Sequence, residues 1–142
     1  MLFRKRFLTM GAIALMFLLS SGSLFGQSTG GPTWSVNVGP NAKNWGFVGI
    51  TKDFVIKDRL SFFVTGGFGT ILVGGGAAYY VTSFHESSFV FSSTAGLIGY
   101  HADAAYQWKA GRRGFVTTGV SYGFYFLAYK GFAPVLSYEV RF

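Results

Sequence analysis

The chain ends in Pro134-Val135-Leu136-Ser137-Tyr138-Glu139-Val140-Arg141-Phe142, where large apolar residues alternate with smaller or charged ones. Side chains two positions apart share one face of a β-strand. One face of this segment therefore carries Pro, Leu, Tyr, Val and Phe, whereas the other carries Val, Ser, Glu and Arg. The alternation predicts a strand with one apolar and one polar face.

The same period of two recurs upstream. In each repeat one face carries mostly aromatic and branched aliphatic residues, and the other carries mainly Gly, Ser, Thr and a few charges. Clusters of Gly, Pro, Asn and charged residues, which favour turns, separate the repeats. The pattern predicts eight strands, at residues 33–39, 44–56, 60–69, 71–81, 88–97, 100–109, 114–128 and 133–142.

Composition excludes several classes of protein. With 50% hydrophobic and 12% charged residues, the chain is too apolar to be disordered, and its 21 glycines lack the three-residue period of collagen. It contains no cysteine. A disulfide framework, a thiolate zinc site, a cysteine nucleophile and an acylated lipoprotein cysteine are therefore excluded.

Residues 1–26 have the three parts of a secretory signal peptide. Three cations at 4–6 precede the apolar stretch Gly11–Leu19, and small residues follow from Ser20 to Gly26. We expect cleavage after Gly26, with Ser23 as an alternative, which leaves residues 27–142 as one barrel domain. An uncleaved membrane anchor is the competing interpretation.

Export changes the charge balance. The formal net charge of +7 includes the three signal-peptide cations, so the mature chain has nine basic and five acidic residues. These basic residues are scattered, with only Arg112 and Arg113 adjacent, and form no stripe that could follow a phosphate backbone. Nucleic acid is not an expected partner.

The bulky face of each predicted strand indicates a barrel with its apolar side outward. A water-soluble barrel buries its large apolar side chains and covers its outside with charges. Fourteen charged residues in about 116 are too few for such a coat. A transmembrane β-barrel, apolar toward lipid and polar inside, solves this problem. A soluble exported barrel is the alternative, and helical spans are disfavoured by the many glycines between Leu60 and Phe84.

An even number of strands places both termini at one end, which we expect to be periplasmic. The charged turns at 57–59, 85–86 and 109–113 then lie on that side. Trp34, Tyr106 and Trp108 fall near the same interface, and Trp45 and Tyr100 near the outer one, as aromatic girdles require.

An eight-stranded barrel is just wide enough for its own side chains. The period of two points a set of polar residues inward, where we expect a hydrogen-bonded and ion-paired network. Its predicted members are His101, Asp103, Gln107, Lys109, Glu139 and Arg141. A narrow pore is the alternative, because the many inward Gly and Ser residues leave room for water.

These features together resemble the small outer-membrane β-barrel proteins of the OmpA/OmpX-like type. The resemblance implies a monomeric outer-membrane protein of a Gram-negative bacterium, surrounded by outer-membrane lipid and without a cofactor. Its implied role is structural, as a barrier, or slow passage of small solutes. It also implies that Tyr138, Val140 and Phe142 form a signal for the barrel-assembly machinery. The connections here are short, which argues against surface recognition.

A lipid-modifying enzyme, of the lipid A acyltransferase or deacylase type, is the alternative function. His85-Glu86-Ser87 and the pair His101 and Asp103 contain residue types that could activate a serine. The first group falls in a predicted periplasmic turn, away from outer-leaflet lipid, and a structural role is expected for both. Two distant histidines predict no metal site. Gly74-Gly75-Gly76 lacks the remainder of a phosphate-binding loop.

Overall fold

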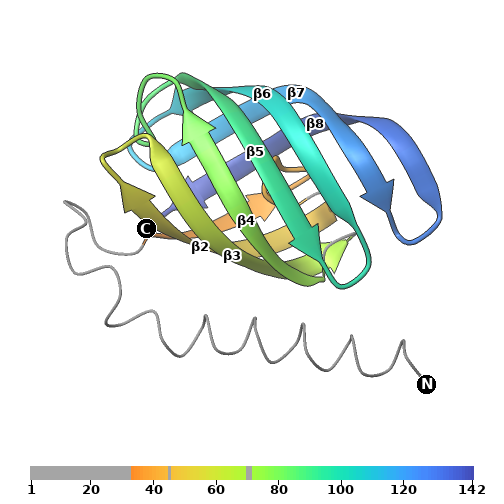
Figure 1. The fold of residues 1–142 in the computed structure, drawn as a ribbon. Helices are drawn as coiled ribbons and strands as arrows, with labels where there is room; N and C mark the ends of the chain where they lie inside the picture. The colour runs from red at the N-terminus through yellow and green to blue at the C-terminus, as the bar shows by residue number, and fades with distance from the viewer. Residues whose placement is uncertain (1–32, 45, 70–71) are drawn as a thin grey trace.

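The computed structural model describes residues 33–44, 46–69 and 72–142. The predicted signal peptide at 1–26 and the aromatic residue Trp45 lie outside the described residues. The described chain forms one antiparallel sheet that closes into a barrel of eight tilted strands in sequence order (Figure 1). The strands are β1 (Thr33–Val38), β2 (Gly46–Ile56), β3 (Leu60–Gly69), β4 (Val73–Tyr80), β5 (Ser88–Gly96), β6 (Tyr100–Ala110), β7 (Gly114–Tyr125) and β8 (Tyr129–Arg141). The predicted all-β, eight-stranded antiparallel barrel is confirmed.

The first six strands lie within two residues of their predicted ends, but the last hairpin was placed wrongly. The predicted strands 114–128 and 133–142 leave its turn at 129–132, around Lys130-Gly131, whereas these residues belong to β8. The turn lies at 126–128 instead, and Phe126 and Leu127 adopt left-handed φ angles of 54° and 55°. Bulky residues rarely adopt this conformation, so no turn signal marks the position.

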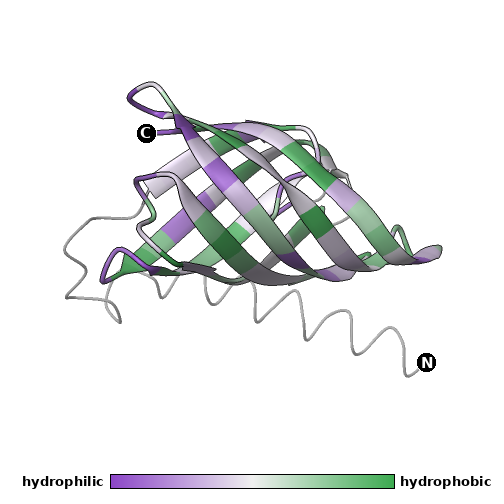
Figure 2. Cartoon of the chain, turned by 90° about the horizontal axis from the view of Figure 1, so that it is seen from above, coloured by the Kyte–Doolittle hydropathy of each residue, from purple (hydrophilic) through white to green (hydrophobic). Residues whose placement is uncertain are grey.

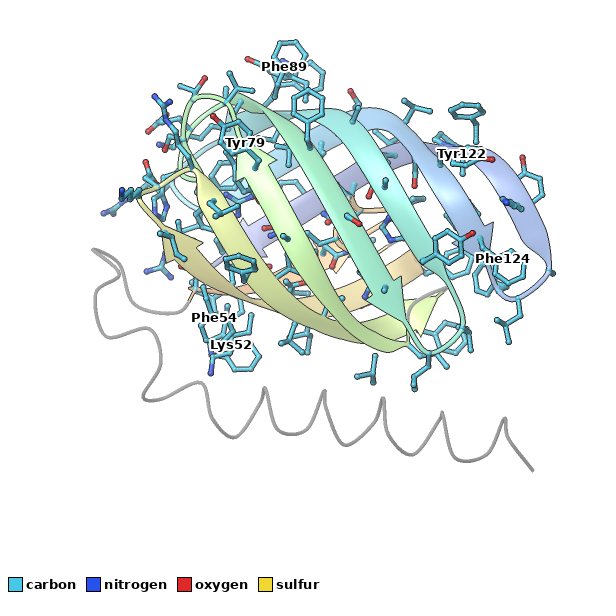
Figure 3. The ribbon with its side chains drawn as sticks, viewed as in Figure 1. Lys52, Phe54, Tyr79, Phe89, Tyr122 and Phe124 are labelled. Carbon is cyan, nitrogen blue, oxygen red and sulfur yellow. The ribbon has the colours of Figure 1, made fainter. Side chains whose placement is uncertain are left out.

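Alternate residues point into and out of the barrel as the period of two predicts. In β7, Ser121 and Tyr125 are buried, whereas Val120 and Tyr122 are exposed. Figure 2 shows the corresponding alternation of hydrophobic and hydrophilic residues along the strands. The labelled aromatic residues in Figure 3 project from the outer surface of the wall.

The barrel has two ends that differ in their connections. Both ends of the described sheet, near Thr33 and Phe142, lie at one end, which we call the terminal end, with the turns at 57–59, 81–87 and 111–113. At the opposite, distal end β1, β3, β5 and β7 end and β2, β4, β6 and β8 begin. The β7–β8 hairpin projects beyond its neighbours there (Figure 1).

The sheet closes through the pairing of β1 with β8. Four residue pairs form this ladder, from Ser35 with Arg141 to Val38 with Tyr138, compared with twelve between β7 and β8. Backbone hydrogen bonds beyond the strand ends extend the seam. Trp34 and Phe142 exchange two, and Leu136 N donates to Pro40 O. In the residues that the structure describes, no helix is long and apolar enough to cross a membrane.

Candidate functional site

Four charged side chains, two of each sign, form a network inside the barrel. Lys43 Nζ lies 2.8 Å from Asp53 Oδ2 and 3.4 Å from Glu139 Oε1. Arg141 Nε lies 2.6 Å from the same Glu139 oxygen. We call Lys43, Asp53, Glu139 and Arg141 the interior network. All four residues are buried, so each charge depends on these partners in place of water.

Lys43 reaches the interior because the β1–β2 connection folds into the barrel. Residues 41–44 are all buried, and we call them the plug. The Asn41 amide donates to Ser137 Oγ and Glu139 Oε2, and its side-chain oxygen accepts from Lys43 N. Ser92 Oγ donates to Ala42 O across the lumen. Side chains of β5 and β8 therefore hold the plug in place.

The environment of Lys43 favours its charged form. Burial by itself lowers the pKa of the ammonium, but the carboxylates of Asp53 and Glu139 outweigh burial and raise the pKa above its ordinary value. Ser61 donates to Asp53 Oδ1 at 2.7 Å, which satisfies the other oxygen of that carboxylate. The network is balanced in charge and well supplied with hydrogen bonds.

The terminal end is closed by the turn between β4 and β5. Phe84 in this turn is fully buried, and its carbonyl accepts hydrogen bonds from Arg141 Nη1 and Gln107 Nε2. The Arg141 guanidinium lies 4.0 Å from the Phe84 ring centroid and 3.9 Å from that of Phe115. An apolar cluster surrounds the ring, and it comprises Val55, Phe63, Ala78, Tyr80 and Val90.

A second polar cluster lies on β5 and β6. His101 Nδ1 is 2.6 Å from Asp103 Oδ2, which also accepts a hydrogen bond from Ser92 Oγ. Both His101 and Asp103 are buried. His101 Nε2 and Asp103 Oδ1 have no hydrogen-bond partner among the described residues. The carboxylate stands between the histidine and the serine, so the imidazole makes no contact through which it could activate Ser92.

Five of the six residues predicted for the lumen lie inside the barrel, and one does not. His101, Asp103, Gln107, Glu139 and Arg141 are buried, and Arg141 Nη2 donates to Gln107 Oε1 at 2.8 Å. The prediction for Lys109 is wrong. This residue has the inward register of Phe115, its partner on β7, but lies at the strand end and is exposed. Its ammonium extends beyond the wall and pairs with Glu86 at 2.7 Å.

The other predicted residues lie on the outer surface. Trp34 and Trp108 are exposed near the terminal end, Tyr106 is half-buried beside Trp108, and Tyr100 is exposed near the distal end. At the end of the last strand Tyr138 and Val140 face outward, and Phe142, directly after the strand, is exposed. These positions are compatible with the predicted girdles and assembly signal.

The His85-Glu86-Ser87 motif does not assemble a nucleophile. His85 is exposed, and its Nε2 lies 3.7 Å from Asp58 Oδ1. Ser87 Oγ accepts from Lys109 N instead of contacting the imidazole. In the described ranges, no group of three or more His, Cys, Asp or Glu residues could hold a metal ion.

Sequence reasoning missed three of the residues that matter most inside the barrel. Lys43 and Phe84 lie in connections, where no period of two assigns a direction. Asp53 lies in β2 beside Lys52, a pair that interrupts the apolar pattern of that segment. Alternation from Thr51 to Val55 would have pointed Asp53 inward.

Comparisons of the chain with protein-family models, with curated proteins and with solved structures find no match. A functional conclusion therefore rests on the barrel and its interior.

Proposed function

We propose that this protein is a small β-barrel of the outer membrane of a Gram-negative bacterium, exported by its signal peptide and inserted by the barrel-assembly machinery. Its role is structural, as a closed element of the permeability barrier, with no catalysis and no cofactor. It acts as a monomer surrounded by outer-membrane lipid.

The observation that supports this proposal is that the barrel is polar inside and apolar outside, the reverse of a water-soluble barrel. Charges, hydroxyls and amides fill the inside, whereas the outside carries large apolar side chains such as Phe132 and Leu136, which are 68% and 60% exposed. An apolar outer surface with a polar interior suits hydrocarbon surroundings. Closure of the sheet supports the same conclusion, because an unpaired edge would be costly in lipid.

The filled interior supports a barrier role over slow solute passage. The plug occupies the lumen from the distal side, and Phe84 with Arg141 occupies the terminal side. Burial of His101 and Asp103, together with the exposed position of His85, supports the absence of catalysis.

The test is expression in a Gram-negative host, followed by gel mobility of the outer-membrane fraction with and without boiling. A heat-dependent shift of the mature band is expected, because a closed barrel resists detergent until it is heated. Absence from the fraction, or an unshifted band within it, would overturn the proposal.

A substitution on the outer wall separates the membrane barrel from a soluble one. Leu136→Arg places a charge in the middle of the wall and should cost about 2–4 kcal/mol in lipid, with loss of the heat-shifted band. Leu127→Arg, at a similarly exposed leucine in the β7–β8 turn, is the matched control and should be tolerated. Equal tolerance of both substitutions would favour the soluble barrel.

A further inference from the structure

A groove lies on the outer wall of the barrel. It has a volume of about 440 Å³ and runs over β2 and β3, from Trp34 and Lys52 toward Phe68 and Val73. Its floor is largely backbone, because Gly66 and Gly67 contribute no side chain. The four residue-to-residue steps from Val48 to Lys52 give it a length of roughly 13 Å along the strand.

A single cation stands at one end of this groove. Among the charged residues of the described strands, only Lys52 and Lys130 lie on the outer face, and Lys130 lies near the distal tip of the β7–β8 hairpin. Lys52 is therefore the one charge within the body of the outer wall that the structure describes. Figure 3 shows it beside Phe54, projecting away from the barrel.

The surroundings of Lys52 hold its ammonium near the terminal end. Nζ lies 5.3 Å from the ring centroids of both Trp34 and Phe54. Aromatic faces attract a cation, but they do not neutralise it. A charged lysine on a lipid-facing wall costs free energy, and its side chain extends so that the ammonium lies toward the membrane surface. A negatively charged partner would remove most of that cost.

We propose that the groove binds one anionic phospholipid of the surrounding membrane, with an acyl chain along β2 and β3 and the phosphate at Lys52. The inference rests on the proposed membrane location. Charge complementarity supports an anionic lipid over a zwitterionic one, because the described turns of the terminal end, with Lys109 beside them, carry five basic and two acidic residues. The apolar lining suits an acyl chain.

Trp34 lines the groove and provides the probe. The variant Trp45→Phe/Trp108→Phe retains Trp34 as its only tryptophan, and Trp34→Phe/Trp45→Phe retains Trp108 on the opposite wall as a matched control. Each is reconstituted in phosphatidylcholine vesicles that contain either brominated phosphatidylglycerol or brominated phosphatidylcholine at equal mole fraction. Bromine on the acyl chain quenches a tryptophan that it contacts.

We expect Trp34 to show about a fivefold preference for phosphatidylglycerol, the effect of one lysine near a lipid surface, and Trp108 to show none. Lys52→Gln should abolish the preference, whereas Lys130→Gln should leave it unchanged. Gly66→Leu should reduce quenching of Trp34 by both lipids by filling the groove. The nearest atom to an added Cβ at Gly66 is Leu72 O at 3.4 Å, so the wall can accept a side chain there.

Equal quenching of Trp34 by the two lipids, or a preference that survives Lys52→Gln, would overturn the inference. So would weaker quenching of Trp34 than of Trp108 by both lipids, because a second copy of the chain would then cover the groove. In all three cases a heat-shifted, inserted barrel leaves the proposed barrier role standing, although the third would replace the proposed monomer by a dimer. A chain that neither inserts into the membrane nor shows quenching of either tryptophan would overturn both the inference and the proposed function.

Discussion

Lys43 joins the two carboxylates of the interior network and brings them together from different strands. Asp53 comes from β2 and Glu139 from β8, so the ammonium links opposite ends of the chain through one side chain. Removing a partner from a buried ion pair leaves an uncompensated charge, which is more damaging than removing the whole pair.

This argument yields a prediction for stability. Lys43→Met should destabilise the barrel by about 3–5 kcal/mol, because it leaves a net buried negative charge. Lys43→Met/Asp53→Asn restores neutrality and should recover part of that loss. Urea unfolding in lipid vesicles, followed by tryptophan fluorescence, gives the comparison. A double variant less stable than the single one would contradict a dominant role of charge balance.

At the residue scale, sequence alone placed only the two network members of the last strand. Glu139 and Arg141 could be assigned because their neighbours alternate without interruption up to Phe142. Lys109 shows the limit of this reasoning, because the period gives a direction but does not show where the wall ends. The period of two could not place Lys43, because this residue lies in a connection, where side chains do not alternate.

At the scale of elements, two connections close the lumen from opposite ends. The plug enters between β1 and β2, and the turn between β4 and β5 carries Phe84 inward. Both are short, and their length alone did not indicate that they fold into the barrel. Their inward folding follows from tertiary contacts, namely the hydrogen bonds of Asn41 with Ser137 and of Arg141 with the Phe84 carbonyl.

Two closures in series predict how conductance responds to their removal. The wild type should show no conductance steps in planar bilayers. Neither Lys43→Gly/Asn44→Gly nor Phe84→Gly alone should open a path, because the other closure stays in place. The combined triple variant should conduct. Steps from either variant alone, or silence from the combination in a barrel that still shows its heat shift, would contradict this account.

The last hairpin shows why strand ends were harder to predict than strand faces. Gly131 offers the usual chemistry of a turn, yet it pairs with Gly123 within the ladder. The chain reverses earlier, at Phe126 and Leu127, in a left-handed conformation that their side chains disfavour. The backbone hydrogen bond from Leu127 N to Ile98 O ties this turn to the β5–β6 connection. Such a tertiary restraint leaves no local signal in the sequence.

At the scale of the whole molecule, closure of the barrel depends on the pairing of β1 with β8. The phenylalanine at the C-terminus contributes in two ways. Its backbone exchanges two hydrogen bonds with Trp34, and its side chain is exposed on the outer surface, 60% accessible. Only the side chain belongs to the predicted assembly signal.

Two variants separate these contributions. Phe142→Ala keeps the backbone bonds and should refold in detergent micelles like the wild type, but should yield less heat-shifted protein in the outer membrane. Deletion of Phe142 should impair both, because the seam loses its last two bonds. Unchanged membrane yield for Phe142→Ala would show that the ring is no assembly signal.

The adjacency of Trp34 and Phe142 has a consequence for how the chain could be arranged. A linker between these positions would turn the eight strands into an uninterrupted ring, and a cut in the exposed turn at 111–113 would supply new ends. Every strand pairing would survive such a circular permutation, and exposed turns are the sites at which permutation succeeds. For the barrel itself, the chain need not begin at β1, and any of its exposed turns could supply the ends.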